Sequence, residues 1–411
     1  MSIRLRGALL VGCAVVLVST GLGLGLGLPV SASNPATSAP PPNPGTAAPF
    51  AHLQHIFVIM MENTGYDTLL TPSNTNTQFI QSMATHDALE TDYFGVTHTS
   101  LPNYVAATSG NTWGSNNDDE TQANAGYLDH TSVFDQFAQA GISWKAYMEG
   151  LPYPGYAGTY GDCKVGTTPS NATTPTCARG HKTALYARKH NPVMQYPHDY
   201  GNPALANDVV PLTQLTTDLA ANTVPQFAWI TPNLCNDMHG GVKGACGYPA
   251  NTTPSTPSQV ALYQDGNGFL QTWVTKIMSS RAWKQGSSAI FITWDEGSYR
   301  NGGATGTTFG PKDTSGCCDS PVIPTTRVTP TTGTGGNLAD SFTYGGGHVP
   351  MIVVESHARY SHGGTGPRDA APANHYSLLQ TIEMNWGLAF LGNASDTLNV
   401  HSLAPLLTPT H

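Results

Sequence analysis

Five short apolar runs, separated by segments of helical periodicity, constrain the fold of this chain most strongly. Each run is five to seven residues long, which is too short to span a membrane as a helix. Buried strands of a parallel sheet need not alternate polar and apolar residues, so continuous apolar runs of this length are typical of them. The predicted strands are residues 56–61, 142–148, 227–231, 289–294 and 349–354.

Helical spacing of apolar residues appears between and after these runs. Residues 133–137 precede Gly141, a candidate helix C-cap, and further apolar faces occur at residues 269–277 and 378–386. Alternating strands and helices predict an α/β fold with a mostly parallel central sheet flanked by helices. Residues 299–347 are rich in Gly and Thr and lack this periodicity, so we expect a long functional loop there.

The N-terminus has the pattern of a secretory signal peptide. Arg4 and Arg6 precede an apolar stretch over residues 8–28, and small residues end at Ala32, where we expect cleavage. A retained membrane anchor and lipid attachment at Cys13 are the alternatives. Cleavage would give a secreted, extracellular protein with no stable membrane insertion.

Two segments follow the predicted signal peptide of residues 1–32. Residues 33–50 are rich in Pro, Ala, Ser and Thr, a composition typical of an extended linker. Residues 51–411 contain no internal repeat and no second linker, so we expect one domain.

Six cysteines remain after the predicted cleavage, an even number that suggests disulfides in an exported protein. Proximity in sequence suggests the pairs Cys163–Cys177 and Cys235–Cys246. The adjacent Cys317 and Cys318 could bond to each other or to cysteines elsewhere.

Charge is scarce and acidic. Charged residues make up 10% of the chain, against roughly 25% in an ordinary domain, and the net charge is −9 at pH 7. Nucleic acid is excluded as the main partner, because binding to a phosphate backbone needs a basic surface.

Against this background, two strands end in pairs of side chains rich in oxygen. Glu62-Asn63 follows residues 56–61, and Asp295-Glu296 follows residues 289–294. In open α/β sheets, ligands bind beyond the carboxyl ends of the strands, and carboxylate and amide oxygens suit a hard divalent cation. The two pairs are therefore candidates for a metal site, the alternative being solvated turn residues.

Ser100 precedes Pro102 and a segment that can continue as a helix, which would place Ser100 at a helix N-terminus. Such a position attracts phosphate, and a hydroxyl there can act as a nucleophile. The alternative is an ordinary N-cap.

Histidines and a basic pair supply further candidates. Asp237 and His239 follow the run at 227–231, and His239 could bind phosphate or protonate a leaving group. Lys189-His190 could hold an anion or be a solvated basic patch, and His348 and His375 precede a predicted strand and helix.

Five motifs follow one another along the chain: Met60-Met61-Glu62-Asn63, His98-Thr99-Ser100-Leu101-Pro102-Asn103-Tyr104, Pro232-Asn233 with Asn236-Asp237-Met238-His239, Thr293-Trp294-Asp295-Glu296 and His375-Tyr376-Ser377-Leu378-Leu379. In this order they resemble the phosphoesterase family, which joins bacterial phospholipases C with secreted acid phosphatases, and in particular its mycobacterial-type secreted acid phosphatases. A Tyr-Ala-Arg-Lys-His stretch at residues 186–190 adds to the resemblance.

The resemblance implies an alkaline-phosphatase-like fold, with residues 51–411 as the catalytic domain, and a role for each motif. It implies one divalent metal ion held by Glu62, Asn63, Asp295 and Glu296, with Ser100 as nucleophile and His239 and Asp237 near the transferred phosphoryl group. The residues expected to bind substrate are His98, Asn103, Lys189, His190 and His375.

The expected activity is that of a secreted acid phosphatase, which hydrolyses phosphomonoesters through a phosphoserine. The substrate is a small phosphate ester or a phospholipid headgroup. Thr64-Gly65-Tyr66-Asp67 departs from the Arg-Ser-Phe-Asp that is frequent in phospholipases C. A phospholipase C-type phosphodiesterase is the alternative, and an inactive secreted binding protein is the second.

Overall fold

The computed structural model describes residues 48–115, 118, 128–161, 185–240, 246, 259–297, 313, 315–321, 345–358 and 365–410. The predicted signal peptide (residues 1–32) and the Cys163–Cys177 pair lie outside these ranges, as do most of the predicted linker (33–50) and most of the loop (299–347). Phe50, the last residue of that linker, is buried and forms a β-bridge with Pro409.

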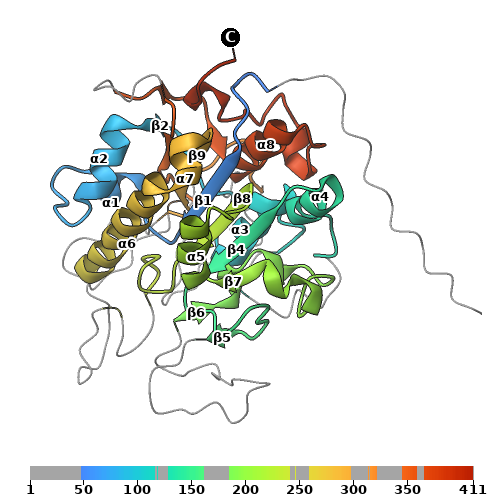
Figure 1. Ribbon diagram of the computed structural model, residues 1–411. Coiled ribbons are helices and arrows are strands. Elements are labelled where there is room, and N and C mark those ends of the chain that lie inside the picture. The colour runs from blue at the N-terminus through green and yellow to red at the C-terminus, as the bar shows by residue number, and fades with distance from the viewer. Residues whose placement is uncertain are drawn as a thin grey trace, which may run out of the picture. The chain divides into compact units, whose positions relative to one another are not determined.

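An eight-stranded sheet forms the centre of the fold, in the order β11-β2-β10-β9-β1-β8-β4-β7 (Figure 1). All five predicted runs contribute strands to it. β1 lies in the middle and is parallel to both neighbours, β8 and β9. The strands are β1 (His55–Met61), β2 (Ala88–Glu90), β4 (Trp144–Met148), β7 (Val209–Pro211), β8 (Phe227–Thr231), β9 (Ser288–Trp294), β10 (Met351–Glu355) and β11 (Arg368–Asp369).

The predicted α/β fold with a mostly parallel sheet is confirmed. One predicted strand differs in direction, because β10 runs antiparallel to both β9 and β2. An apolar run reports that a strand is buried and says nothing of its direction. Two small ladders complete the strands: β3 (Tyr93–Phe94) with β12 (Ala373–Asn374), and β5 (Tyr160–Gly161) with β6 (Tyr186–Ala187).

Helices cover both faces of the sheet. On one face, the Phe227 ring of β8 contacts Phe137 and Trp386, at centroid distances of 4.8 and 6.4 Å. On the other, Lys145 and Tyr147 of β4 each donate a 2.7 Å hydrogen bond to Asp218. The first face holds α3 (Ser100–Ser109), α4 (Val133–Ala140) and α8 (His375–Trp386); the second holds α1 (Tyr66–Leu70), α2 (Gln78–His86), α5 (Thr213–Ala221), α6 (Gln259–Ser279) and α7 (Arg281–Gln285) (Figure 1).

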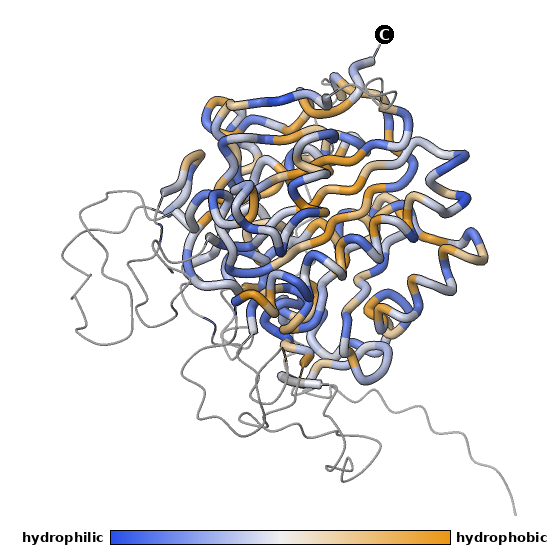
Figure 2. The backbone as a smooth tube through the Cα atoms, turned by 90° about the vertical axis from the view of Figure 1, so that its left-hand side faces the viewer, coloured by the Kyte–Doolittle hydropathy of each residue, from blue (hydrophilic) through white to orange (hydrophobic). Residues whose placement is uncertain are grey.

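Short 3₁₀ helices lie in the connections: η2 (Arg188–His190), η3 (Val193–Gln195), η4 (Pro203–Asn207), η6 (Gly392–Ser395) and η7 (Ala404–Leu406). The apolar residues gather along the strands in the interior of the fold (Figure 2). Within the described ranges, no helix is both long and apolar enough to cross a membrane.

Helix ends follow the chemistry of the sequence. α4 begins at a capping box formed by Ser132 and Asp135, and it ends at Gly141, whose φ of +69° suits glycine. This confirms the predicted C-cap. Two disulfides are present in the described residues, Cys235–Cys246 as predicted and Cys317–Cys318, which resolves the open choice for that pair.

Candidate active site

The carboxyl ends of β1, β8 and β9 bring three acidic residues together. Glu62 directly follows β1, Asp295 directly follows β9, and Asp237 lies in the loop after β8. Main-chain hydrogen bonds join the three segments, because Asp295 N–H donates to the Met61 carbonyl (2.9 Å) and Glu62 N–H to the Asp237 carbonyl (2.8 Å). The Cys235–Cys246 disulfide closes the loop that carries Asp237.

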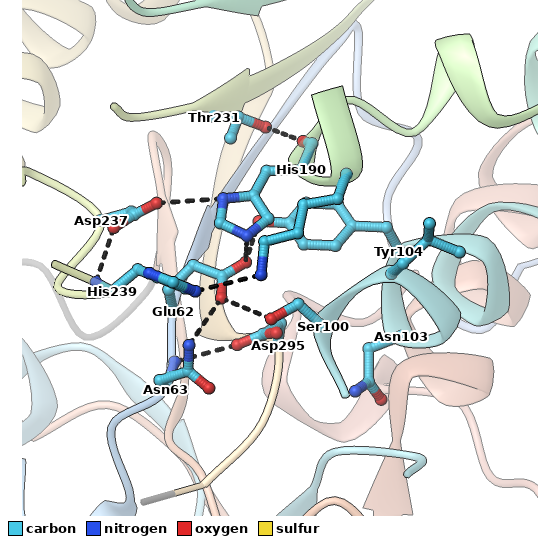
Figure 3. Close-up of polar contacts among 12 residues, drawn as sticks. Glu62, Asn63, Ser100, Asn103, Tyr104, His190, Thr231, Asp237, His239 and Asp295 are labelled. Atoms are coloured by element: carbon cyan, nitrogen blue, oxygen red, sulfur yellow. Dashed lines mark hydrogen bonds and ion pairs between the residues drawn. The ribbon is translucent and has the colours of Figure 1, made fainter. Parts of the chain in front are cut away.

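Glu62 is the centre of this cluster, and its side chain is fully buried. Its Oε2 accepts hydrogen bonds from Ser100 Oγ (2.9 Å) and Asn63 Nδ2 (3.1 Å), and its Oε1 accepts one from Tyr104 OH (2.7 Å) (Figure 3). Ser100 is the first residue of α3, as predicted, and its helix is buried along its whole length. The predicted nucleophile and the first predicted metal ligands are therefore neighbours.

Asp295 joins the same cluster through the backbone of Asn63. The Asn63 N–H donates to Asp295 Oδ1 (3.0 Å), and Asn63 has a φ of +47°, a conformation that asparagine tolerates better than most residues. The second oxygen, Asp295 Oδ2, is buried without a hydrogen-bond partner among the described residues. A buried, unpartnered carboxylate oxygen is costly unless a cation or a donor completes it.

His190 bridges two of the carboxylates. Its Nε2 lies 3.1 Å from Glu62 Oε1 and its Nδ1 lies 3.2 Å from Asp237 Oδ2 (Figure 3). Thr231, the last residue of β8, donates from Oγ1 to the His190 carbonyl (3.1 Å) and so fixes its main chain. Burial lowers the pKa of His190 well below its usual value, and the nearby Lys189 adds to this effect.

Lys189 and His239 form the next pair. Lys189 Nζ donates to His239 Nε2 (3.1 Å) and to Asp118 Oδ2 (2.9 Å), and Asp237 Oδ1 accepts the His239 N–H (2.7 Å). His239 Nδ1 lies 3.0 Å from the Gly240 carbonyl, so the proton of the neutral ring belongs on Nδ1. Burial, and then the charge of Lys189, lower the pKa of His239 to about 4. The ring is therefore neutral, and its Nε2 can accept the hydrogen bond that Lys189 donates.

The charge of the cluster is excessively negative for a buried site. Burial raises the pKa of Glu62, and repulsion from Asp295 and Asp237 raises it further. Burial, and then repulsion from Glu296, raise the pKa of Asp295 to about 8, while burial is the main cause of a raised pKa at Asp237. Lys189 keeps its proton, because attraction to Asp118 and Glu62 outweighs the cost of burial and raises its pKa.

These features fit a divalent cation. Three buried carboxylates converge with an amide and a hydroxyl, and two of their oxygens, Asp237 Oδ2 and Asp295 Oδ2, have no hydrogen-bond partner among the described residues. Such oxygen ligands suit hard cations, whose charge would offset the repulsion. A second candidate ligand set overlaps it, since ligand atoms of Glu62, His190 and His239 all lie within 4.8 Å of one another.

Glu296 and His98, two further predicted site residues, contact each other beside the cluster. The Glu296 Oε2 carboxylate oxygen is paired with His98 Nδ1, and His98 Nε2 lies 2.7 Å from the Asp313 carbonyl. Both side chains are buried. The metal-binding role of Glu296 and the substrate-binding role of His98 stay predictions.

The structure places Asn103 and His375 behind the cluster, in contact with its backbone. Asn103 Oδ1 accepts the N–H groups of Val96 (2.8 Å) and Thr97 (3.1 Å), so this side chain holds the loop before Ser100. His375 Nε2 lies 2.6 Å from the Asp295 carbonyl. Both side chains are buried, and their predicted contact with substrate stays a prediction.

Sequence reasoning missed Tyr104 and Asp118. Tyr104 stands four residues after Ser100, and residues at this spacing share one face of a helix, so the spacing could have indicated it. Asp118 lies in a polar segment without periodicity, where no local signal separates it from its neighbours.

Three glycines let the loops around the cluster touch, and we refer to Gly95, Gly297 and Gly346 as the glycine junction. Gly346 N–H donates to the Gly95 carbonyl (2.8 Å) and Gly297 N–H to the Gly346 carbonyl (2.6 Å). A Cβ on Gly95 would lie 2.7 Å from the Asp295 carbonyl oxygen, and one on Gly346 would lie 2.5 Å from that of Thr97. Backbones can approach this closely because no side chain separates them.

Comparison with known proteins agrees with the motifs. Residues 72–250 match the model of the Phosphoesterase family. An acid phosphatase of Aspergillus fumigatus is 32% identical over 50% of this chain and 40% of its own length, and a phosphate-repressible acid phosphatase of Penicillium chrysogenum is 25% identical over 84% and 64%. A phosphatidylinositol-3-phosphatase of Mycobacterium tuberculosis is 26% identical over 60% and 65%. The chain thus spans less than two thirds of the length of each of these relatives.

Solved structures with a similar backbone include a protein of the alkaline phosphatase superfamily from Vibrio parahaemolyticus, with a TM-score of 0.44 and 11% identity over 83% of this chain and 68% of that one. A phosphonate monoester hydrolase from Silicibacter pomeroyi gives a TM-score of 0.45 and 11% identity over 86% and 76%. The family match over residues 72–250 and the similarity to these phosphatases agree with the ordered motifs of the sequence.

Proposed function

We propose that this protein is a secreted, metal-dependent phosphoesterase that hydrolyses phosphomonoesters, with the activity of an acid phosphatase. The observation that carries the proposal is the position of Ser100 Oγ, at the N-terminus of α3 and 2.9 Å from the buried Glu62 carboxylate. A hydroxyl at a helix N-terminus, inside a cluster that fits a cation, is suited to phosphoryl transfer. The names of the phosphatase relatives support this assignment.

Glu62, Asn63 and Asp295 would hold the divalent cation, and the family resemblance adds Glu296. When bound, such a cation lowers the pKa of a coordinated hydroxyl and offsets the charge of a phosphate. Secretion is supported by the predicted signal peptide and by the disulfides, which form in oxidising compartments.

The proposed reaction has two steps, phosphorylation of Ser100 and hydrolysis of the phosphoserine. Ser100 Oγ loses its proton and bonds to phosphorus, while the bond from phosphorus to the ester oxygen breaks and the alcohol leaves with a proton. Water then attacks the phosphoserine, which releases inorganic phosphate and restores the hydroxyl. Lys189 offsets the negative charge of the transferred group, and the neutral His239 holds its ammonium in place.

The test is hydrolysis of an aryl phosphate and a bis-aryl phosphate by the purified protein, before and after dialysis against EDTA. We expect faster hydrolysis of the monoester, loss of activity after EDTA, and recovery with a divalent cation. Ser100→Ala should abolish turnover, whereas Ser82→Ala, at an exposed position of α2, should not change it. Full activity of Ser100→Ala would exclude the nucleophile, and a preference for the diester would replace the phosphatase by a phosphodiesterase.

A further inference from the structure

Asp118 contacts two groups that a phosphate ester would also need. Its Oδ2 accepts a hydrogen bond from Lys189 Nζ (2.9 Å), and its Oδ1 accepts one from the main-chain N–H of Leu101 (3.2 Å). Leu101 directly follows Ser100, in the first turn of α3. The Asp118 carboxylate therefore bridges two donors: the Leu101 amide, which is next to the proposed nucleophile, and the Lys189 ammonium.

The chemistry of this pair of donors matches a phosphoryl group. A phosphate bound to Ser100 presents anionic oxygens that take charge-assisted hydrogen bonds from ammonium groups and from helix N-terminal amides. A carboxylate presents two anionic oxygens to donors in the same way. Asp118 thus makes, from within the chain, the contacts that a substrate oxygen would make.

Asp118 differs from the other acids around Ser100 in its access to solvent. Its side chain keeps 35% of its surface exposed, whereas the Glu62 side chain is fully buried and Asp237 and Asp295 are buried as well. A carboxylate at the edge of the cluster can rotate into water without the desolvation cost that holds the buried ones. Lys189, with 14% of its side chain exposed, stays in place through its second contact with His239.

We propose that the Asp118 carboxylate competes with the phosphoryl group of the substrate for Lys189 and the Leu101 amide, and so sets the affinity of the site for phosphate. This inference rests on the proposed function. Asp118 is then a specificity-determining residue, because each bound anion must displace it and weakly charged anions do so poorly. If Asp118 only positioned Lys189, removing the Asp118 charge would weaken phosphate binding instead of strengthening it.

The experiment measures the binding of inorganic phosphate to the whole, metal-loaded protein by titration calorimetry, with KM and kcat for an aryl phosphate alongside. Asp118→Asn keeps the size of the side chain and removes its charge, and we expect phosphate to bind about tenfold more tightly, because the ligand no longer displaces a charge-assisted contact. KM should fall by a similar factor. Asp118→Ser, a second variant, should change both in the same direction.

Asp396→Asn is the matched control, since that exposed carboxylate lies in the turn after η6 and its loss should not change phosphate binding. Unchanged or weaker phosphate binding by both Asp118 variants would overturn the inference and leave the phosphatase activity standing. A parent protein that neither binds phosphate nor hydrolyses the ester would instead overturn the proposed function, and the inference with it.

Discussion

Two histidines of this protein lie between carboxylates, and their surroundings give them opposite properties. His190 lies 3.1 Å from Glu62 and 3.2 Å from Asp237, and burial lowers its pKa. His198 lies 3.3 Å from Asp129 and 3.2 Å from Asp135. There the hydrogen bond with Asp135 is the largest effect and raises the pKa of His198 to about 9.

The two histidines differ in their exposure to solvent and in the charges of the groups beside them. His190 has 2% of its side chain exposed and Lys189 beside it in the chain, so a second positive charge is disfavoured. His198 has 37% exposed and a third carboxylate, Asp199, at 3.6 Å. Water and the excess of acids there stabilise the protonated ring. The same residue pattern therefore favours a neutral ring inside the candidate active site and a cationic one at the surface.

Both clusters have ligand atoms close enough for a metal ion, so a measurement of metal binding tests most directly whether the two clusters differ in function. Asp295→Asn removes a buried carboxylate with an unpartnered oxygen, and we expect loss of the bound divalent metal and a fall in kcat of about 10³ or more. Elemental analysis and aryl phosphate turnover measure both.

Asp199→Asn is the control for that change, because it removes a carboxylate from the His198 cluster. It should leave the metal content and kcat unchanged. Equal metal loss in the two variants would show that the two clusters do not differ in the way that their burial indicates.

The hydrogen bond from Tyr104 to Glu62 allows a second test, for which we expect a smaller effect. Tyr104→Phe removes the 2.7 Å hydrogen bond to Glu62 Oε1 and leaves the ring in place, so we expect kcat/KM to fall about 10-fold, the range seen when a hydrogen bond to a metal-site carboxylate is lost. Tyr196→Phe is the matched control, since its hydroxyl bonds to Thr108 at the other end of the same helix. Equal losses from both would assign the effect to α3 in general.

The smallest effect concerns stability at the surface cluster. The folded pKa of His198, about 9, lies above the ordinary histidine value of roughly 6.5, so its stabilising contribution is complete below that value and is lost as the pH rises through 9. Because the side chain is partly exposed, solvent screening limits the contribution to about 1 kcal/mol or less.

His198→Gln should therefore lower the Tm more at pH 6 than at pH 10, as thermal unfolding monitored by circular dichroism would show. His86→Gln, at the exposed end of α2, is the control. A Tm difference that stays constant with pH would contradict the raised pKa.

The sequence predicts the parts of this molecule that follow from local patterns. The apolar runs identify the central strands, and the rule that ligands bind at the carboxyl ends of parallel strands brings Glu62 and Asp295 to one place. The start of α3 at Ser100 follows from Pro102 and the residues after it. These inferences need only burial, periodicity and helix-end chemistry.

Other parts depend on contacts between distant segments, which no local pattern reports. The antiparallel direction of β10 is decided by its pairing with β9 and β2. Asp118 meets Lys189 across 71 positions in the sequence, and nothing in its own segment distinguishes it. The predicted substrate residues Asn103 and His375 turn out to contact the backbone, because a motif reports residue types and not the direction in which a side chain points.

The glycine junction has a consequence for any survey of random variants. Gly95, Gly297 and Gly346 carry no reactive group, yet their carbonyl and amide groups meet directly behind Asp295 and Glu296. Losses of activity should therefore gather at Gly95 and Gly346 as densely as at the acids themselves, and less at Gly297, where the nearest atoms to an added Cβ lie 3.3 Å away. A map of the positions that tolerate no substitution would therefore extend beyond the residues that react. Its glycine positions would mark the places where the main chain, and not a side chain, cannot be replaced.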